Sequence, residues 1–462
     1  MYRFIAVFSS CKDVEYAIEE KIPGFSEKLS LFERAFTSSH FELYTQEIEG
    51  PFKEPDLRVW DDQIFMGELY GDVEEEDLIE WVSRDRFPGV RREGALDGKY
   101  LFFVVKGNAL HVFRDPLGLK PLYASKIGPL FLFSSEKKYL WLSGAREIFS
   151  LTPNHLYEFE GESFSPKMKC VDFSPHPKLS VSLEDSIERM VKMLSDRMER
   201  LLRDVRNVGV AFSGGVDSSL TARLASLVGK EVTLITVGLR GSRDLEKAAE
   251  AARTLDLPLV LMERGLDDVA EDVPEAVRLV EEADIMKIGV ALPFLWVSRY
   301  LRESSTPVMV TGQGSDEVYA GYDRYLRIYR DLGEKAVEEA ILQGVLQSHL
   351  INFERDEKVV SNQGVQLRYP LISPEAVSYA LRLPLRFKIS SVEDEHRKII
   401  IRKVAERMGL PERTAWGRKK SLQYSTLTDK AIRKLAKTKG RSPEKYLKDI
   451  FEKLFPPNTN SG

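Results

Sequence analysis

The pattern of apolar and polar positions changes in character about one third of the way along the chain. Before about residue 165, short apolar or alternating runs separated by turn residues are typical of β-strands. The run at 100–105 is almost continuously apolar, as expected of a strand covered on both faces, and Lys106-Gly107-Asn108 predicts a hairpin turn after it. We therefore predict a layered β-sheet with few helices, its strands lying within RFIAVFSS, HFELYTQ, QIFMGELYG, KYLFFVVKGNALHVFRD and LFLFSSE.

Three prolines, Pro166, Pro175 and Pro177, interrupt the pattern after this region. A proline fixes φ and lacks the backbone N–H, so regular structure tends to stop there, and we predict a linker over 166–180. Ser182, followed three residues later by Asp185, then has the sequence of a helix N-cap, and the apolar spacing predicts an amphipathic helix to about Leu202.

Beyond this helix, apolar strands alternate with helical patterns. NVGVAFSGG reads as a strand, VDSSLTARLASLVG as a helix, EVTLITVGL as a strand and DLEKAAEAARTLDL as a helix, and TPVMVTGQG repeats the strand that ends in glycines. Such an order predicts an α/β domain with a parallel sheet and helices on its faces. The predicted organisation is therefore a first domain over 1–165, a linker over 166–180 and a second domain over 181–455.

Length and composition narrow the class of protein. A chain of 462 residues is too long for a single compact core, and 43% hydrophobic with 30% charged residues indicates folded domains. Two cysteines are too few for a disulfide framework or a cysteine-based zinc site. The sequence contains neither an apolar run of membrane-spanning length nor a signal-peptide pattern at its start, so we expect a cytoplasmic protein without a membrane partner. The net charge of -5 does not favour nucleic acid or anionic membranes as partners.

The most informative local motif is Ser213-Gly214-Gly215-Val216-Asp217-Ser218-Ser219, which follows an apolar strand and precedes a helix. Glycines let backbone N–H groups approach phosphate oxygens, the serine hydroxyls add donors, and the start of a helix is partially positive. Asp217 would repel a phosphate unless a cation lay between them, so it is a candidate Mg²⁺ ligand. A glycine-rich turn with capping Ser and Asp residues is the alternative interpretation.

This loop lacks the lysine of the Walker motif, and it resembles the loop of the ATP pyrophosphatases. Four further segments resemble the asparagine synthetase family in the correct order along the chain: VGLRGSRDLEKAAEAA (237–252), TGQGSDEVYAGYDRY (311–325), QLRYPLIS (366–373) and EHRKIIIRKVAERMGLPERTAWGRKKSLQYS (395–425). The resemblance implies an adenine-nucleotide-hydrolase-like (PP-loop) parallel-sheet domain with a helical C-terminal part, which binds ATP and Mg²⁺.

The resemblance also implies roles for individual residues. Asp217 and Asp316, each after a glycine-containing loop at a predicted strand end, are the candidate Mg²⁺ ligands. Lys419 matches the family lysine that stabilises the charged transition state, and Lys398 matches a basic position that contacts pyrophosphate. The implied ATP-binding residues are Ser213, Gly214, Gly215, Asp217, Ser218, Ser219, Val237, Gly238 and Gly312.

Two positions depart from the family pattern in this half. Gln313 stands where the family has the glutamate thought to take a proton from ammonia, and Gln366 replaces the glutamate of the E-x-R-x-P stretch. An amide does not accept and hold a proton near neutral pH, so both conventional bases are missing. Adenylation is compatible with these changes, whereas ordinary ammonia transfer is in doubt.

The first half resembles the family's glutamine-hydrolysing domain, a class II, Ntn-type α+β layered sandwich. The resemblance rests on Leu96-Asp97-Gly98-Lys99-Tyr100, on 114–123 (RDPLGLKPLY) and on 134–137 (SSEK). Catalysis in that domain needs an N-terminal cysteine, and Tyr2 occupies its place. The oxyanion-hole asparagine becomes Met66. We therefore expect an amidotransferase fold whose glutamine chemistry is lost.

The expected function is that of an AMP-forming ligase that adenylates a small-molecule carboxylate, aspartate by default, for amide formation with ammonia or another amine. One alternative is an adenylating tRNA-modifying enzyme, because basic residues outnumber acidic ones roughly two to one after about residue 386. A non-catalytic nucleotide-binding paralogue is another. Members of the family are often dimers, so a homodimer is compatible with the resemblance.

Overall fold

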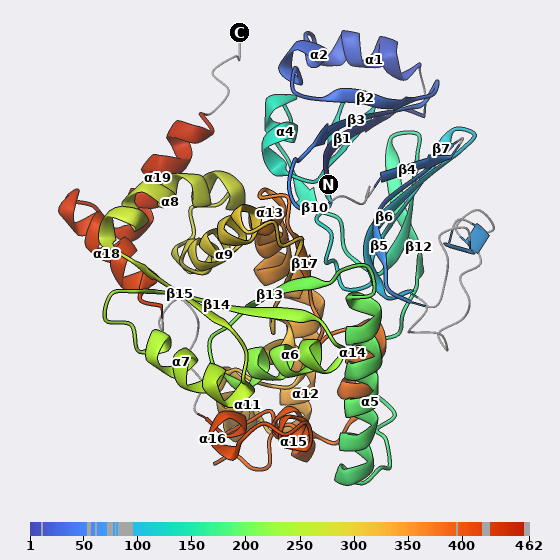
Figure 1. Cartoon of the computed structure of the whole chain (residues 1–462). Helices are drawn as coiled ribbons and strands as arrows, with labels where there is room; N and C mark the ends of the chain where they lie inside the picture. Colours follow the sequence, from blue (N-terminus) through green and yellow to red (C-terminus); the bar gives the residue numbers. More distant parts are fainter. Residues whose placement is uncertain are drawn as a thin grey trace. The chain divides into compact units, whose positions relative to one another are not determined.

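The computed structural model of the chain describes residues 1–10, 13–52, 57–60, 62–71, 77–78, 80–81, 96–393, 396–417 and 426–456. The chain divides into two compact units, the first made of 1–49, 53–172 and the residues from 452 onward, and the second of 50–52 and 173–451. The main division lies between Asp172 and Phe173, inside the predicted linker. Each unit has its own sheets in Figure 1.

The first unit contains two six-stranded sheets, in the orders β10-β8-β9-β1-β3-β2 and β12-β11-β7-β6-β5-β4. All the pairings described in them are antiparallel. The strands are β1 (Tyr2–Phe8), β2 (Glu33–Thr37), β3 (Phe41–Glu47), β4 (Leu57–Trp60), β5 (Gln63–Leu69), β6 (Gly98–Lys106), β7 (Ala109–Arg114), β8 (Tyr123–Ile127), β9 (Leu130–Ser134), β10 (Phe149–Ser150), β11 (His155–Glu160) and β12 (Ser163–Lys169).

The alternation of side chains along β1 shows how the layers form. Phe4, Ala6 and Phe8 enter a core shared with residues of both sheets, such as Phe103 on β6. Ile5 and Val7 enter a second core, on the opposite face. Because successive side chains of a strand point to opposite faces, one sheet is covered on both sides, by the other sheet and by the helices α1 (Val14–Lys21), α2 (Phe25–Lys28) and α4 (Lys137–Leu142).

The strands of this unit agree with the predictions, whereas two of its helices and the start of the linker that follows it do not. The strands within the five predicted runs are present, and Gly107 forms the predicted hairpin with φ +56°. The helices α1 and α2 were not predicted. The predicted start of the linker was also wrong, because Pro166 lies within β12. β12 is an edge strand, and its pairing with β11 shifts register next to Pro166, where a missing N–H is tolerated.

The RDPLGLKPLY motif has a structural role in this unit. The buried Arg114 guanidinium donates to the carbonyls of Lys120, Gly118 and Leu151 at 2.7–2.9 Å. Asp115 accepts hydrogen bonds from three backbone N–H groups of the same loop. Burial raises the pKa of Asp115 to about 6, against the effect of Arg114 and these N–H groups. The two side chains thus satisfy the backbone of a buried loop.

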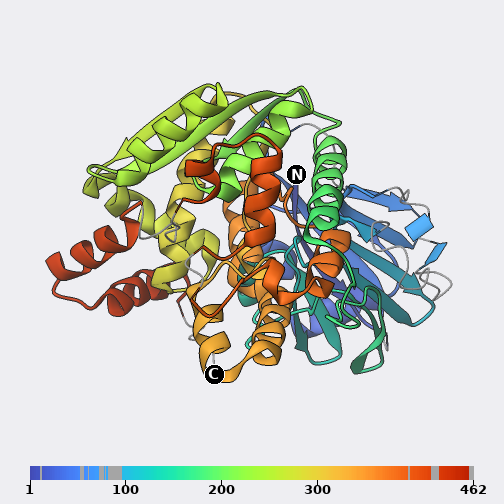
Figure 2. The same ribbon diagram turned by 90° about the horizontal axis from the view of Figure 1, so that it is seen from below.

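The second unit is built on a parallel sheet of five strands in the order β15-β14-β13-β16-β17. The strands are β13 (Asn207–Ala211), β14 (Glu231–Leu239), β15 (Leu259–Arg264), β16 (Val308–Val310) and β17 (Gln366–Arg368). The first three follow one another toward one edge of the sheet, and the chain then crosses back to continue on the other side of β13. The predicted parallel sheet with helices is therefore confirmed, and Figures 1 and 2 show it from two directions.

The helices of this unit divide between the two faces of the sheet. Because crossovers between parallel strands are right-handed, α6 and α7 lie on one face, and the helices between β15 and β17 lie on the other. The helices described in the second unit are α5 (Leu183–Leu201), α6 (Val216–Leu227), α7 (Arg243–Leu255), α8 (Leu266–Val280), α9 (Ile285–Glu303), α10 (Ser315–Val318), α11 (Asp323–Leu332), α12 (Glu334–Ser348), the π-helical turn η2 (His349–Phe353), α13 (Glu354–Ser361), α14 (Pro374–Arg382), η3 (Leu385–Phe387), α15 (Ile399–Arg407), α16 (Glu412–Ala415), α18 (Thr428–Thr438) and α19 (Pro443–Leu454). Helix α19 extends past residue 451, where the second unit ends.

The helix predicted to begin after Ser182 is confirmed as α5. The Ser182 hydroxyl accepts a hydrogen bond from the backbone N–H of Asp185 at 3.0 Å. Buried residues recur every three or four positions along α5, among them Ile187, Met190 and Leu194. Among the described residues, none of the helices is both long enough and apolar enough to cross a membrane.

Candidate functional site

The site is located where the strand order of the parallel sheet reverses. The loops that leave the carboxyl ends of β13 and β16 run toward opposite faces, and such a switch point opens a crevice. A cavity of about 420 Å³ lies there, lined by the β13 loop (Ser213, Asp217, Ser218), the β16 loop (Thr311, Gly312, Gln313, Asp316), the end of β14 (Ile235, Thr236, Val237) and residues of α9, of 322–324 and of the 351–355 segment.

The loop after β13 has the form expected of a phosphate-binding turn. Gly214 has φ +67°, a conformation that favours glycine, and Gly215 is the N-cap of α6. The Ser213 N–H donates to the Ser218 hydroxyl at 3.2 Å, and that hydroxyl donates to the Gly215 carbonyl at 3.2 Å. The Ser219 hydroxyl is buried and has no hydrogen-bond partner among the described residues.

Glycine at 312 lets the two loops touch. A Cβ at Gly312 would lie 2.7 Å from the Cβ of Asp217 and 3.0 Å from its carbonyl carbon. Such distances are shorter than van der Waals contact, so a larger residue would force the β16 loop away from α6. The contact brings Asp217 and Asp316, both of which line the cavity, to the same end of the sheet.

The two aspartates share one cation, Lys398. The Lys398 Nζ lies 2.8 Å from both carboxylate oxygens of Asp217 and 2.6 Å from Oδ1 of Asp316. The Ser315 hydroxyl donates to Asp217 at 2.7 Å. A Cβ at Gly321 would lie 1.8 Å from Asp316 Oδ1 and 2.2 Å from Lys398 Cε, so only glycine leaves room for this arrangement. Lys398, Asp217 and Asp316 are called the lysine–aspartate cluster below.

The backbone around Lys398 is in an unusual conformation. Arg397 and Lys398 have φ values of +45° and +55°, which are uncommon for residues with a side chain and tend to occur at functional sites. The lysine is at the N-cap of α15, and its side chain is only 2% exposed. Burial lowers the pKa of Lys398, and the Asp217 carboxylate opposes this effect. The charged ammonium is therefore retained through its carboxylate partners.

The cluster is compatible with a magnesium ion bound together with a nucleotide. Mg²⁺ binds through one or two carboxylates plus substrate phosphates, and Asp217 and Asp316 supply that donor set at the edge of the cavity. Over the described ranges, no group of three or more His, Cys, Asp or Glu side chains forms a metal site by protein ligands alone. The two aspartates would therefore hold the ion only in company with phosphate oxygens.

Gln313 contacts a carboxylate that sequence reasoning did not identify. Its Nε2 donates to Oδ2 of Asp356 at 3.1 Å, and Oδ1 of Asp356 accepts from the Arg355 Nε at 2.7 Å. Asp356 is fully buried on α13, whereas Gln313 and Arg355 line the cavity. Burial raises the pKa of Asp356, and the Arg355 guanidinium opposes the increase.

Among the predicted site residues, those that line the cavity are Ser213, Asp217, Ser218, Val237, Gly312, Gln313 and Asp316, whereas Gly214, Gly215, Ser219 and Lys398 do not line it. Gln366 is 1% exposed on β17 and is not among the residues that line the cavity, and Gly238 is not among them either. Val237 lines it, at the end of β14. Lys419, the predicted catalytic lysine, lies outside the described residues. Arg402, a neighbour of Lys398, donates to the carbonyls of His396, Arg397, Ala415 and Gly417, so its guanidinium supports the backbone.

Other residues of the cavity were missed from sequence. Lys287, Tyr322, Arg324, Asn352 and Arg355 all line it. Tyr322 is partly buried, whereas Tyr319 and Tyr325 are buried. A run of charged residues over 354–358, which contains Arg355, is normally found on a solvated face, so the sequence held no sign of its burial.

In the first unit, Met66 and Tyr2, the positions predicted to lack their amidase groups, lie on strands. Met66, on β5, is 1% exposed in the core between the two sheets. Tyr2 begins β1, opposite Glu47 on β3. Burial raises the pKa of the free Cys170 thiol to about 12, so it does not provide a thiolate near neutral pH. The other cysteine of the sequence, Cys11, lies outside the described residues.

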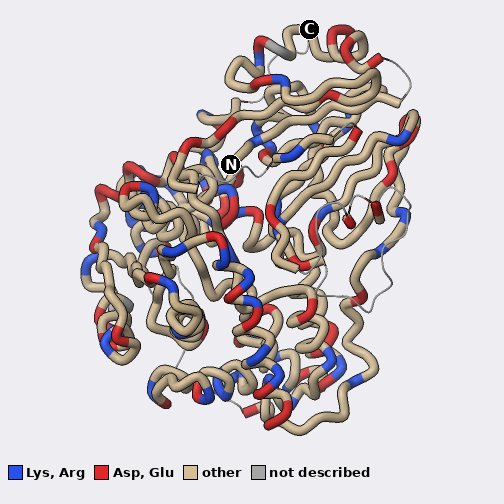
Figure 3. Tube along the Cα trace, turned by 45° about the vertical axis from the view of Figure 1, so that its right-hand side comes forward, with Lys and Arg blue, Asp and Glu red and all other residues tan. Residues whose placement is uncertain are grey.

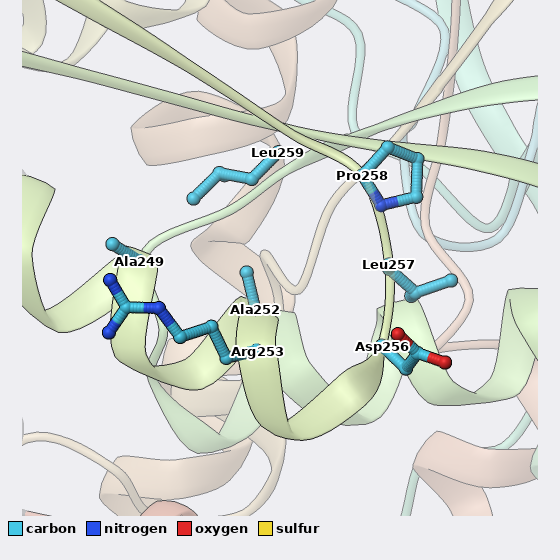
Figure 4. Close-up of a pocket in the computed structure, with 7 residues that line it drawn as sticks. All are labelled: Ala249, Ala252, Arg253, Asp256, Leu257, Pro258 and Leu259. Atoms are coloured by element: carbon cyan, nitrogen blue, oxygen red, sulfur yellow. The ribbon is translucent and has the colours of Figure 1, made fainter.

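A second hollow lies away from this chemistry. It has a volume of about 540 Å³ and is bounded by the end of α7 and the start of β15. Its lining is mostly apolar, and the side chains of Arg253 and Asp256 point away from each other in Figure 4. This hollow lacks converging polar groups, so the cavity at the switch point is the better candidate.

Some of the basic residues near the end of the second unit pair with acidic residues. Figure 3 shows charges of both signs interspersed along the helices. On α18, Arg433 pairs with Asp429, and Arg441 and Lys445 both pair with Asp449 on α19. The excess of basic residues in the sequence therefore does not form an uninterrupted basic face over these helices.

Comparison with known proteins identifies the family. The model of the asparagine synthase family matches residues 190–352 and 329–456, more than half of the chain. A Methanocaldococcus jannaschii protein named "Putative asparagine synthetase (glutamine-hydrolyzing) 1" is 31% identical over 405 residues, covering 78% of this chain and 74% of that protein. Asparagine synthetase 2 (glutamine-hydrolyzing) of Oryza sativa is 26% identical, over 64% of this chain and 51% of its own length. The solved structure of the NMN synthetase from Francisella tularensis is 12% identical to this chain, and the match covers 61% of this chain and 90% of that chain. Its TM-score of 0.31 is too low to establish a common fold. With its phosphate loop, lysine–aspartate cluster and these relatives, the chain belongs to the asparagine synthase family.

Proposed function

We propose that the protein is an ATP-dependent, AMP-forming ligase that adenylates a small carboxylic acid, aspartate by default, and joins it to ammonia or another amine. Membership of the family makes a ligase of the asparagine synthetase type the starting point. The observation that carries the proposal is the convergence of the phosphate loop, Asp217 and Asp316 on one cavity at the switch point of the sheet.

The first step requires two anions to meet. A carboxylate oxygen of the acid attacks the α-phosphorus of ATP, the bond to the β-phosphate bridge breaks, and pyrophosphate leaves with the bonding pair. The N–H groups of Gly214 and Gly215 and the start of α6 are suited to hold phosphate oxygens. Mg²⁺, held by Asp217 and Asp316, would neutralise phosphate charge, and Lys398 beside them keeps a positive charge at the same place. Lys419 remains the proposed stabiliser of the transition state.

The remaining ATP contacts follow from the same arrangement. We assign the phosphates to Ser213, Ser218 and Ser219, and the nucleoside to the end of β14 at Val237 and Gly238. The Thr236 hydroxyl donates to the Phe212 carbonyl at 2.7 Å, which ties this strand end to the phosphate loop. Such a bond supports a fixed distance between the phosphate and nucleoside positions.

The first unit is proposed to be an Ntn-type amidotransferase fold that no longer hydrolyses glutamine. Tyr2 stands in place of the nucleophilic cysteine, and a phenol whose pKa is near ~10 is not a thiolate. Met66 places an apolar side chain in the core where an amide donor would be needed. Free ammonia or another amine is therefore the proposed nitrogen donor.

Exchange of radioactive pyrophosphate into ATP tests the adenylation step separately from amide formation. Full-length protein, ATP and MgCl₂ would be incubated with aspartate and with a panel of other amino acids. We expect exchange that depends on the acid, and its loss in Asp217→Asn. If no acid supports exchange while ATP still binds, the protein is a non-catalytic nucleotide-binding paralogue. Acid-independent modification of added tRNA would favour the RNA-modifying alternative.

A further inference from the structure

The orientation of Gln313 is fixed by its single side-chain hydrogen bond. The Gln313 Nε2 donates to Oδ2 of Asp356 at 3.1 Å, so the NH₂ group of the amide faces this carboxyl group. The carbonyl oxygen Oε1 is then directed away from Asp356 and has no partner among the described residues. Because Gln313 lines the cavity, this oxygen is an acceptor available to a ligand.

The same carboxylate holds a second group of the cavity wall. Arg355 donates through Nε to Asp356 at 2.7 Å, and its other nitrogens donate to the Ile351 carbonyl at 3.0 Å and to Oδ1 of Asn352 at 3.4 Å. The guanidinium pairs with Asp356, whose side chain is completely buried. Asp356 thus couples two side chains that line the cavity, Gln313 on the loop after β16 and Arg355 on α13.

We propose that Asp356 is a positioning residue for the amine-transfer step, holding Gln313 so that its Oε1 accepts a hydrogen bond from an N–H of the attacking amine. This inference rests on the proposed ligase function and identifies how the site recognises its nucleophile. A neutral acceptor in this position binds a nucleophile that carries N–H donors. Here a glutamine, Gln313, replaces the family's glutamate, and the carboxyl group of Asp356 lies next to the Gln313 amide on the side away from the cavity.

The chemical step remains balanced without a base at position 313. The lone pair of the amine nitrogen forms a bond to the acyl carbon of the adenylate. The bond from that carbon to the AMP oxygen then breaks, and AMP leaves with the electron pair. One proton passes from the nitrogen to the departing phosphate, since the Gln313 amide holds no proton near neutral pH. Gln313 orients the amine, and Asp356 acts only through Gln313.

An exchange of the two side chains separates positioning from packing. The variants are Asp356→Asn, Gln313→Glu and the double variant Gln313→Glu/Asp356→Asn, in the intact chain. Glu281→Gln is the matched control, because Glu281 is a fully buried carboxylate paired with Lys358 on the same helix as Asp356, and neither Glu281 nor Lys358 lines the cavity. Two rates would be measured. The first is the rate of acid-dependent ATP–pyrophosphate exchange, and the second is the rate of amide formation as a function of the concentration of ammonium chloride or hydroxylamine.

We expect Asp356→Asn to raise the KM for ammonium about tenfold, the effect of one lost hydrogen bond, while the exchange rate stays within about twofold of the wild type. Gln313→Glu alone places two carboxylates side by side and also raises this KM. The double variant, in which the introduced asparagine amide donates to the introduced glutamate carboxylate, binds ammonium better than either single variant. Glu281→Gln lowers the melting temperature without changing the KM.

Four results would overturn the inference. Additive losses in the double variant would show that the two side chains do not act as a pair. Equal changes of exchange rate and KM in Asp356→Asn, as for a general loss of folded protein, would show a purely structural role. Absence of exchange in the wild type with every acid would overturn the proposed function and this inference with it, whereas normal exchange with an unaltered KM in Asp356→Asn would overturn the inference alone.

Discussion

Replacing Lys398 by methionine tests whether its ammonium holds the two aspartates together. The side chain is 2% exposed, and the carboxylates of Asp217 and Asp316 are 17% and 14% exposed. Loss of one partner from a buried ion pair costs about 3–5 kcal/mol, and we expect the lower end because both carboxylates keep some contact with the cavity. For a domain of this size, ~3 kcal/mol corresponds to a fall of about 6–12 °C in the melting temperature.

Magnesium distinguishes this explanation from a simple packing defect. Without the lysine, Asp217 and Asp316 form an uncompensated pair of oxygen ligands, so MgCl₂ should raise the melting temperature of Lys398→Met more than that of the wild type. Differential scanning calorimetry with and without MgCl₂ measures both effects. Lys403→Met is the control, because Lys403 is on the same helix but pairs with Glu406 at the surface, where a pair is worth about 0–1 kcal/mol.

Two outcomes would refute this reasoning. Melting of Lys398→Met within about 1 °C of the control would mean that the ammonium does not hold the carboxylates together. A large loss of stability that MgCl₂ does not reduce relative to the wild type would mean that the two aspartates do not form a cation site.

Three further predictions concern other parts of the chain. Gly321→Ala should destabilise the protein by about 1–3 kcal/mol and disrupt the lysine–aspartate cluster, whereas Gly265→Ala, where the new Cβ would be 3.5 Å from its nearest neighbour, should be close to neutral in the same thermal melts. Burial lowers the pKa of Lys388 to about 7, and the nearby charge of Lys178 contributes to this decrease, so at pH 7–10 the unfolded chain binds a proton that the folded chain lacks and stability rises with pH. Lys388→Met should therefore stabilise the protein most below pH 7, by a few kcal/mol. Urea titrations in which this gain does not shrink toward pH 10 would contradict the prediction. Met66→Asn should not restore glutamate release from glutamine and should cost about 1–3 kcal/mol, because it buries an amide in an apolar core; measurable release of glutamate would refute it.

Local patterns predicted the strands, the α5 cap and the phosphate loop, because each is determined by residues close together in sequence. Ser182 and Asp185 are three residues apart, and the glycines of the phosphate loop directly follow β13. The order of strands and helices was enough to predict a parallel sheet, although it did not determine where the strand order reverses.

The remainder of the site depends on contacts that local patterns do not encode. Lys398 and Asp217 are 181 residues apart, and their pairing arises only when the C-terminal helices pack beside the sheet. The buried charges at 354–358 contradict the usual rule that a charged run faces solvent. Asp356 was therefore not predicted from sequence, although its partner Gln313 was named as a departure from the family pattern.

The π-helical turn His349–Phe353 makes the length of this helical stretch part of the site. It joins α12 to α13 and accommodates one residue more per turn than an α-helix. Five residues in the wider turn rotate through about the same angle as four residues of an α-helix, so the extra residue is absorbed without changing the direction of the residues that follow. If all five residues instead kept a regular α-helical pitch, Arg355 and Asp356 would be rotated by about 100° and would turn away from Gln313. The proposed pairing of Asp356 with Gln313 therefore depends on the pitch of this turn as well as on the two side chains.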